Sequence, residues 1–385
     1  MVERDTSFNF SDSSFVTPQL SRRSFARLFA LATAGAAMPF YNEGTLAHAQ
    51  LSRIGRLPPD AVKINANENP LGPCAEALEA ISKIKKDGGR YLYEETDVFI
   101  ETLAAQEGLK PAYVKAFAGS SAPLHWAVIA FTSPTRSFVT ADPGYEAGGR
   151  AAEFIGAKVV RVPLTKDLAH DVRAMVRADP NAGLLYICSP NNPTGTLTSR
   201  ADIEYALEHK PKGSIVLLDE AYIHYTDAPP ASDLVAAGKD LIILRTFSKL
   251  YGMAGLRAGC AIGRPDLLSR IGSYGAGALP VTAMVAATES LKVKSLVPDR
   301  RQVTRETRED LFAFLRKHGF SFKSSETNCF MLDARGPARQ LMEAMRKEKI
   351  YIGRVWPVWP NYTRITVGTP EEMEKFKKAL LKVLG

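Results

Sequence analysis

The sequence predicts an α/β protein, in which a large domain with a doubly wound, mostly parallel sheet is followed by a smaller α+β domain. Between about residues 113 and 263, short β-rich runs alternate with turns and with helical or loop stretches. Strands interleaved with helices indicate a parallel sheet covered by helices. After Pro265 the pattern changes to long helices, and short strands return only toward the C-terminus.

Several of the expected strands are apolar throughout rather than alternating, which is typical of strands covered on both faces. The strands are expected at 114–118, 137–140, 158–162, 183–188, 214–218, 241–245 and 258–262. Sheets of this kind bind ligands at the carboxyl ends of their strands. We therefore expect functional residues in the turns that follow these runs.

The smaller domain is expected to contain both helices and strands. Helices are predicted at 283–291, 299–317, 338–348 and 371–384, and strands near 329–332, 350–353 and 363–367. The last helix has a clear beginning, because Thr369 can cap it, Pro370 suits its first turn, and two acidic residues follow.

Composition excludes several classes of protein. The chain has 385 residues, of which 45% are hydrophobic and 23% charged, so it can form a large globular domain and a smaller one. The net charge is +8, but basic residues alternate with acidic ones, as in 305–310. That mixture indicates solvated helix faces rather than a nucleic-acid surface. We expect no nucleic-acid partner.

The four cysteines and the histidines show no metal-binding pattern. The cysteines are widely spaced and form no CxxC pair, which gives no support for zinc or redox chemistry. Each stands among small or apolar residues, so we expect buried free thiols. No metal site is predicted.

Residues 1–49 have the order of a secretory signal. SRRSFAR at 21–27 precedes an Ala-rich apolar stretch at 28–40, and AHA at 47–49 offers the small residues that a signal peptidase recognises. The heptapeptide resembles the twin-arginine pattern S-R-R-x-F-L-K, departing at Ala26 and conservatively at Arg27. We expect export to the periplasm with cleavage after Ala49, or a cytoplasmic protein if the signal is not used.

Two alternatives to a cleaved signal stay open. The segment could be an N-terminal helix packed on the domain, or an uncleaved anchor. The apolar run is short for a stable membrane span, so we expect that the protein has no such span.

Four segments lie where the sheet is expected to place functional residues. SPNNPTG at 189–195, DEAY at 219–222 and TFSK at 246–249 each come at the end of a predicted strand, and GLRAG at 255–259 begins the next. Each is weak alone, but the order and spacing are specific. From about Asn65 to the C-terminus the chain resembles fold-type I pyridoxal-phosphate enzymes of the aminotransferase class I/II group, and most of all their histidinol-phosphate aminotransferase-like branch.

The resemblance implies a domain organisation. We expect a signal peptide at 1–49, an N-terminal segment at 50–80 that joins the small domain, a large domain that binds pyridoxal phosphate at 81–280, and linking helices with the small C-terminal domain at 281–385.

Pyridoxal phosphate acts as an electron sink, and the protein supplies binding, orientation and electrostatics. A lysine must bond to the cofactor and, once the substrate displaces it, move a proton at the substrate carbon. The resemblance implies that this lysine is Lys249. It also implies that Asp219 keeps the pyridine nitrogen protonated, that Tyr222 and Asn192 contact the phenolic oxygen, and that Tyr145 stacks on the ring.

The cofactor phosphate requires cations, hydroxyls and backbone N–H groups. The resemblance implies that these come from Gly119, Ser120, Ser121, Thr246, Ser248 and Arg257. The histidinol-phosphate branch usually has an acidic pair where this chain has Ser121-Ala122. The departure leaves the backbone amides available for the phosphate.

Substrate-binding residues are implied in three places. Arg364 resembles the family's carboxylate-binding arginine, and a guanidinium suits a carboxylate because it offers two parallel hydrogen bonds. Arg354 stands where the branch often places an arginine for a substrate phosphate or other anion. Asn69 belongs to the segment that resembles the family's cover over the active site. Trp356 and Trp359 either line the substrate pocket or pack between the domains.

Arg90-Tyr91 resembles the segment whose tyrosine reaches the cofactor phosphate of the neighbouring subunit. The resemblance therefore implies a homodimer with shared active sites.

The expected activity is that of a pyridoxal-phosphate-dependent aminotransferase. It would exchange an amino group between an amino acid, or an amino-acid-derived phosphate ester, and a 2-oxo acid by a ping-pong mechanism through Lys249. Another reaction of the same cofactor (decarboxylation, elimination or cyclisation) and histidinol-phosphate aminotransferase proper remain alternatives. A non-catalytic protein is disfavoured by the complete set of cofactor residues.

An exported enzyme would meet little histidinol phosphate, because histidine biosynthesis is cytoplasmic. We therefore expect a different amino-acid substrate. The Trp356 and Trp359 cluster favours one with an apolar or aromatic side chain.

Overall fold

The computed structural model describes residues 40–50, 57–275 and 278–385. Residues 1–39, which contain most of the expected signal segment, lie outside the described part. Residues 40–385 form one compact unit.

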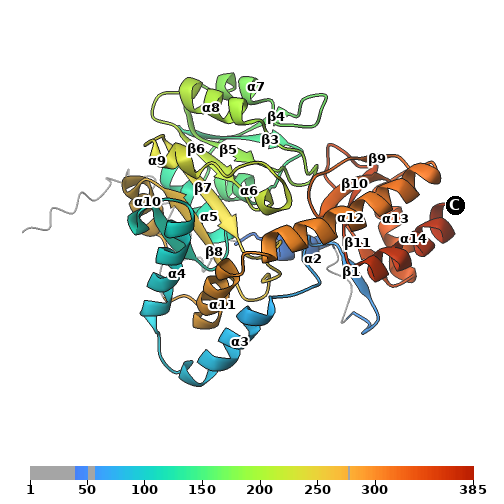
Figure 1. The fold of residues 1–385 in the computed structure, drawn as a ribbon. Helices are drawn as coiled ribbons and strands as arrows, with labels where there is room; N and C mark the ends of the chain where they lie inside the picture. The colour runs from blue at the N-terminus through green and yellow to red at the C-terminus, as the bar shows by residue number, and fades with distance from the viewer. Residues whose placement is uncertain (1–39, 51–56, 276–277) are drawn as a thin grey trace, which may run out of the picture. The chain divides into compact units, whose positions relative to one another are not determined.

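A seven-stranded sheet organises the larger part of this unit, with the strand order β2-β8-β7-β6-β5-β3-β4 (Figure 1). Strand β8 is antiparallel to both of its neighbours, β2 and β7, and the other pairs are parallel. The predicted α/β fold with a mostly parallel sheet is confirmed. The strands are β2 Val114–Phe117, β3 Ser137–Asp142, β4 Val159–Pro163, β5 Ala182–Cys188, β6 Ile215–Asp219, β7 Leu241–Thr246 and β8 Gly259–Gly263.

The central strands are covered on both faces. Every residue of β5, β6, β7 and β8 is buried, as their unbroken apolar runs predicted. Helix α5 contacts both α6 and α10, α7 contacts α8, and α11 packs on α3 and α4. The bounds of these helices and of α9 are as follows: α3 Ala75–Ile84, α4 Tyr93–Gln106, α5 Ser121–Phe131, α6 Ala147–Phe154, α7 Val172–Arg177, α8 Arg200–His209, α9 Ser232–Ala236, α10 Pro265–Gly272 and α11 Val281–Lys292.

A second hydrophobic core is built mainly from the C-terminal residues. It has a three-stranded sheet, β12-β10-β9, and a two-stranded parallel pair, β1-β11. Strands β1 and β9, with three and two residues, are too short to give a pattern in the sequence. The elements are β1 Val62–Ile64, α12 Leu296–Lys317, β9 Phe322–Lys323, β10 Cys329–Asp333, α13 Ala338–Lys347, β11 Ile350–Ile352, β12 Tyr362–Thr366 and α14 Pro370–Leu384.

Two local predictions are confirmed. Thr369 forms a capping box with Glu372 at the start of α14, and Pro370 is its first residue. All four cysteines are free and buried.

Helix α2, Glu43–Gln50, packs against the rest of the unit. Its Leu46 and Ala47 are buried. Its last residue, Gln50, makes two hydrogen bonds with the backbone of Val355, donating from Nε2 to the carbonyl and accepting at Oε1 from the N–H. Just before the helix, the backbone N–H of Tyr41 donates to Nε2 of His125. The last residues of the expected signal segment therefore form a docked helix in this structure.

No helix in the described residues is long and apolar enough to cross a membrane. The same residues contain no group of His, Cys, Asp and Glu side chains that could hold a metal ion.

Candidate active site

The carboxyl ends of the parallel strands meet at one edge of the sheet, and the expected functional residues follow them there. Asp219 ends β6 and Thr246 ends β7, while Tyr145 and Asn192 lie in the turns after β3 and β5. Arg257 reaches the same edge from the opposite direction, because it precedes β8, which is antiparallel and pairs Gly259 with Thr246.

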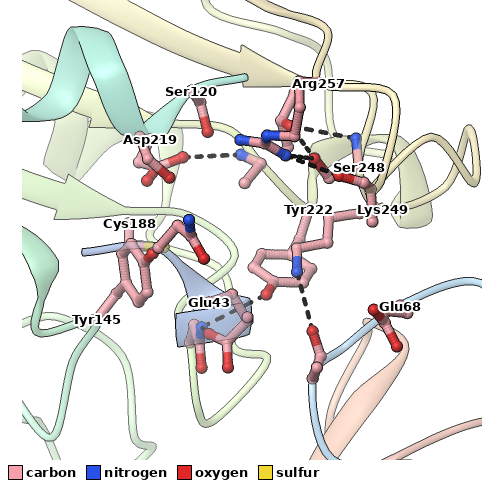
Figure 2. Close-up of a pocket in the computed structure, with 18 of the residues that line it drawn as sticks. Glu43, Glu68, Ser120, Tyr145, Cys188, Asp219, Tyr222, Ser248, Lys249 and Arg257 are labelled. Atoms are coloured by element: carbon pink, nitrogen blue, oxygen red, sulfur yellow. Dashed lines mark hydrogen bonds between the residues drawn. The ribbon is translucent and has the colours of Figure 1, made fainter. Parts of the chain in front are cut away.

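These residues surround a cavity of about 210 Å³, the strand-end cavity (Figure 2). Ten of the residues expected from the sequence line it, namely Ser120, Ser121, Tyr145, Asn192, Asp219, Tyr222, Thr246, Ser248, Lys249 and Arg257. The N-terminal segment lines it too, through Asn42, Glu43 and Gly44.

One end of the strand-end cavity is rich in hydrogen-bond donors. The Arg257 guanidinium donates to Ser248 Oγ over 3.3 Å, and Thr246 Oγ1 donates to the same oxygen over 2.9 Å. Gly119 lies against that guanidinium with a φ of +86°, and a Cβ there would overlap Arg257. A cation, hydroxyls and a glycine turn at the start of α5 form a cradle suited to a phosphate group.

A buried carboxylate lies deeper in the cavity. Tyr186 donates a 2.8 Å hydrogen bond to Oδ2 of Asp219, and the backbone N–H of Ala221 donates to Oδ1 over 3.1 Å. Burial raises the pKa of Asp219 to about 6, although the two hydrogen bonds oppose the shift. A buried carboxylate of this kind would be stabilised by a cationic partner, such as a protonated ring nitrogen.

Lys249 and Tyr222 lie at the side of the cavity toward the N-terminal segment. Lys249 Nζ donates to the carbonyl of Ala66 over 3.3 Å and lies 5.5 Å from the Tyr222 ring (Figure 2). Burial lowers the pKa of Lys249, which favours the neutral, nucleophilic amine. The Tyr222 hydroxyl accepts hydrogen bonds from Asn67 at 2.9 Å and from Asn192 at 3.4 Å.

Arg354, Arg364 and Asn192, which we call the two-arginine site, converge on the carboxylate of Glu43. Arg364 Nη2 donates to Oε1 over 2.7 Å, Arg354 Nη1 lies 3.1 Å from both oxygens, and Asn192 Nδ2 donates to Oε2 over 3.0 Å. Burial alone would raise the pKa of Glu43, but the two guanidiniums hold it well below its usual range. Both arginine side chains are buried, at 1% and 0% exposure.

Two further side chains complete the surroundings of the two-arginine site. Glu146 forms a second ion pair with Arg354. Trp356 is buried and packs under both guanidiniums, with its ring centre 4.7 Å from the Arg354 carbon and 5.5 Å from that of Arg364. Its indole N–H donates to the carbonyl of Gly144 over 2.9 Å, so Trp356 also joins the β11–β12 connection to the turn after β3.

Two expected site residues lie outside both groups. The Asn69 side chain donates to the carbonyl of Leu250 over 2.8 Å and does not line the strand-end cavity. Tyr91 is 72% exposed and stacks on Tyr93 at a ring distance of 5.7 Å. Trp359 also lies apart from the site and packs on Tyr362.

Sequence reasoning missed Glu43, Asn67, Glu146 and Tyr186. Glu43 was assigned to the signal segment, and no spacing pattern connects it with arginines more than 300 residues away. Tyr186 lies in an apolar strand, two residues before its end, where its ring was expected only to pack. Asn67 lies two positions before Asn69, in the segment expected to cover the active site, so its neighbourhood could have indicated it.

The residues of the strand-end cavity fit pyridoxal phosphate. The cradle at Arg257 suits its phosphate, and Lys249 is buried with a lowered pKa. Among the described residues the buried Asp219 forms no ion pair, and the ring nitrogen would supply its cationic partner. An amine, a carboxylate and a phosphate cradle at one sheet edge are the groups that this cofactor requires.

Comparison with known proteins agrees with this geometry. The aminotransferase class I and II family matches residues 59–380, and the chain belongs to this family. It is a pyridoxal-phosphate-dependent aminotransferase, as the sequence predicted.

Individual relatives indicate which members of the family the chain resembles. The chain is 34% identical over 335 residues to the histidinol-phosphate aminotransferase of Symbiobacterium thermophilum, covering 85% of this chain and 91% of that protein. It is 33% identical over 333 residues to the aromatic amino acid aminotransferase of Nocardia farcinica, covering 84% and 91%. The crystal structure of histidinol-phosphate aminotransferase from Sinorhizobium meliloti in complex with pyridoxal-5'-phosphate is similar with a TM-score of 0.80 and 25% identity, covering 95% and 98%.

Proposed function

We propose that Lys249 is the residue that bonds to the cofactor and afterwards moves the proton at the substrate's α-carbon. The bound cofactor supplies an electron sink for that carbon. Lys249 suits the role because burial lowers its pKa and because it lies in the strand-end cavity opposite Asp219. Its amine can accept a proton from one position and return it to another.

The other cavity residues bind and orient the cofactor in this proposal. Asp219 holds the proton on the ring nitrogen, and Tyr186 holds Asp219 in place through its hydrogen bond. Arg257, Ser248, Thr246 and the turn at Gly119–Ser121 hold the phosphate. Tyr145 stacks on the ring, while Tyr222 and Asn192 contact the phenolic oxygen.

We propose that the substrate is an amino acid whose carboxylate binds at the two-arginine site. The observation that carries this is the Glu43 carboxylate already held there by Arg354, Arg364 and Asn192. With Glu146, the group contains two cations and two anions and is electrically balanced. A substrate carboxylate that replaced Glu43 would keep that balance.

The same balance disfavours a phosphate ester. A phosphate monoester carries about 1.5 to 2 negative charges at neutral pH, so it would leave surplus negative charge at a desolvated site, which is costly. We therefore propose an amino acid rather than histidinol phosphate, although several relatives bear that enzyme's name.

The side chain of the proposed substrate is apolar or aromatic. A second cavity shares Tyr145 with the strand-end cavity, and Tyr41, Trp356, Pro357 and Val358 are among its lining residues. Its lining also contains charged side chains, namely Asp142, Glu146, Arg150, Glu153 and Arg161. The aromatic and apolar part of this lining can accommodate an apolar group next to the carboxylate site.

A half-reaction panel tests the substrate proposal. Cofactor-loaded protein would be mixed with phenylalanine, tyrosine, leucine, alanine, aspartate and histidinol phosphate, and the absorbance of the lysine-bound cofactor and the oxo acid released would be followed. Aromatic donors should convert the enzyme fastest. Conversion by histidinol phosphate alone would refute the carboxylate proposal, and equal rates for small, acidic and aromatic donors would refute the side-chain preference.

We propose that the protein is a homodimer in which Tyr91 reaches the partner's cofactor phosphate. Support comes from the exposure of apolar surface on this region, with Tyr91 at 72%, Tyr93 at 58% and Leu78 at 53%. Sedimentation velocity should give a dimer, and Tyr91→Ala should weaken cofactor affinity without changing the dimer. A monomeric holoenzyme would exclude the proposal.

We also propose export through the twin-arginine route, on the strength of SRRSFAR and AHA in the sequence. Cell fractionation of a bacterial host should recover the protein in the periplasm with Gln50 as its first residue. Replacing both Arg22 and Arg23 with lysine should retain it in the cytoplasm. An unchanged distribution would contradict the proposal.

A further inference from the structure

Glu43 occupies the two-arginine site in the manner expected of a substrate. Its carboxylate has one oxygen on Arg364 and the other on Asn192, and Arg354 contacts both. The donors that a substrate carboxylate would use are therefore already engaged. Figure 2 shows Glu43 on the same side of the cavity as Lys249 and Tyr222.

The segment that carries Glu43 also makes contacts that do not involve either guanidinium group. Gln50 makes two hydrogen bonds to Val355, Leu46 and Ala47 are buried, and the Tyr41 N–H donates to His125. Phe40 also stacks on His125 at a ring distance of 4.7 Å. Contacts at both ends of residues 40–50 therefore hold the carboxylate at the site at a high effective concentration.

We propose that Glu43 is an intramolecular ligand that competes with the substrate carboxylate, so that the chain carrying residues 40–50 is autoinhibited. The inference rests on the proposed binding of a substrate carboxylate at the two-arginine site. The two carboxylates cannot share Arg364 Nη2 and Asn192 Nδ2, so the substrate binds only when α2 undocks. The apparent affinity for substrate is therefore proportional to the fraction of molecules in which α2 is undocked.

Glu43 lies on the N-terminal side of the proposed cleavage position. Cleavage after Ala49, as proposed above, would remove Glu43 with nearly all of α2 and leave the two-arginine site open. Ala47, one of the small residues that a signal peptidase recognises, is buried while the helix is docked. Undocking of α2 therefore both opens the site and exposes the segment to be cleaved.

The test uses the cofactor-loaded full chain and the unreactive carboxylate 3-phenylpropionate, which has no amino group to transfer. Glu43→Gln removes the competing charge and keeps the shape of the side chain. Its matched control is His48→Gln, because His48 is exposed on the same helix. Titration calorimetry should show that Glu43→Gln binds the probe about tenfold or more tightly than the wild type, with His48→Gln unchanged.

Kinetics with the best amino donor should show the same competition. Glu43→Gln should lower KM by a similar factor with little change in kcat, since only ground-state access is altered. Equal affinity and equal KM in wild type, Glu43→Gln and His48→Gln would overturn the autoinhibition while leaving the substrate proposal intact. Absence of probe binding in all three would overturn both.

Hydrogen exchange of the wild-type protein tests the same competition without any substitution that could affect folding. Hydrogen exchange of residues 43–50 should accelerate at saturating 3-phenylpropionate, because the bound probe keeps α2 undocked. Unchanged or slower exchange, with the probe bound, would show that substrate and Glu43 do not compete.

Discussion

The strand-end cavity and the two-arginine site lie next to each other but are assembled in different ways. The cavity comes largely from consecutive turns of one sheet, each of which supplies one or two side chains directly after its strand. The two-arginine site joins Glu43, Asn192, Arg354 and Arg364, which are separated by up to 321 residues. The first is fixed by sheet geometry, while the second depends on docking of one segment.

The difference also appears in the electrostatics. Burial shifts the pKa values of Asp219 and Lys249 toward their neutral forms, and neither side chain forms an ion pair within the part of the chain that the structure describes. Glu43 and both arginines are equally buried yet remain charged, because they neutralise one another. The cavity is thus prepared for a charged ligand, whereas the two-arginine site already contains one.

Lys249→Ala should have the largest effect on turnover and tests the role of Lys249 in the strand-end cavity. If Lys249 bonds to the cofactor and moves the proton, its loss should reduce turnover by about 10⁴-fold or more and abolish the absorbance band of lysine-bound cofactor. Lys239→Ala, at an exposed position, is the control. Persistence of both turnover and the band in Lys249→Ala would disprove the assignment.

Asp219→Asn should separate activity from stability. Loss of the carboxylate should lower kcat/KM by about 10²- to 10³-fold, comparable to removal of another preorganised electrostatic group. The cofactor-free protein should become more stable by about 1–3 kcal/mol, because the wild type keeps a desolvated carboxylate whose pKa is raised to about 6.

The pH dependence of that stability difference gives its signature. The folded wild type binds a proton at Asp219 more readily than the unfolded chain, so its stability increases as pH falls through about 6 toward the ordinary value. The advantage of Asp219→Asn should therefore be complete above pH 6 and shrink below it. Denaturant titrations at several pH values measure this, and an advantage that grows with acidity would contradict it.

The contrast between the two sites explains how much the sequence could predict. The strands and the ten cavity residues were predictable, because a parallel sheet brings the residues after its strands to one edge. The relation of Asn69 and Asn67 to the site was not, because a difference of two positions in an irregular segment decides which side chain faces Tyr222.

The occupant of the two-arginine site was beyond sequence reasoning for a different reason. Arg354 and Arg364 were expected to bind anions, but their convergence on one carboxylate depends on the packing of β11, β12 and α2. Glu43 itself carried no local signal, since its neighbours are typical of a signal segment. Tyr91 remains a prediction, because its proposed contact requires a second subunit.

Arg364→Lys tests the two-arginine site with a smaller expected effect. A lysine keeps the charge but cannot offer the paired hydrogen bonds of a guanidinium, so KM should increase by about 10- to 100-fold with a smaller change in kcat. Arg339→Lys, on the exposed surface, is the control. A loss confined to kcat would indicate that Arg364 acts on the cavity rather than on substrate binding.

Trp356→Phe should have the smallest effect and tests whether the support beneath the arginines matters. Phenylalanine keeps an aromatic face for both guanidiniums but loses the indole N–H that donates to Gly144. One buried hydrogen bond contributes about 0.5–1.5 kcal/mol, so KM should increase about two- to tenfold and kcat should change less. The matched control is Trp359→Phe, because Trp359 packs on Tyr362 away from the site and should leave KM unchanged. If Trp359→Phe changes KM as much as Trp356→Phe, the tryptophans act by joining the two cores rather than by orienting the arginines.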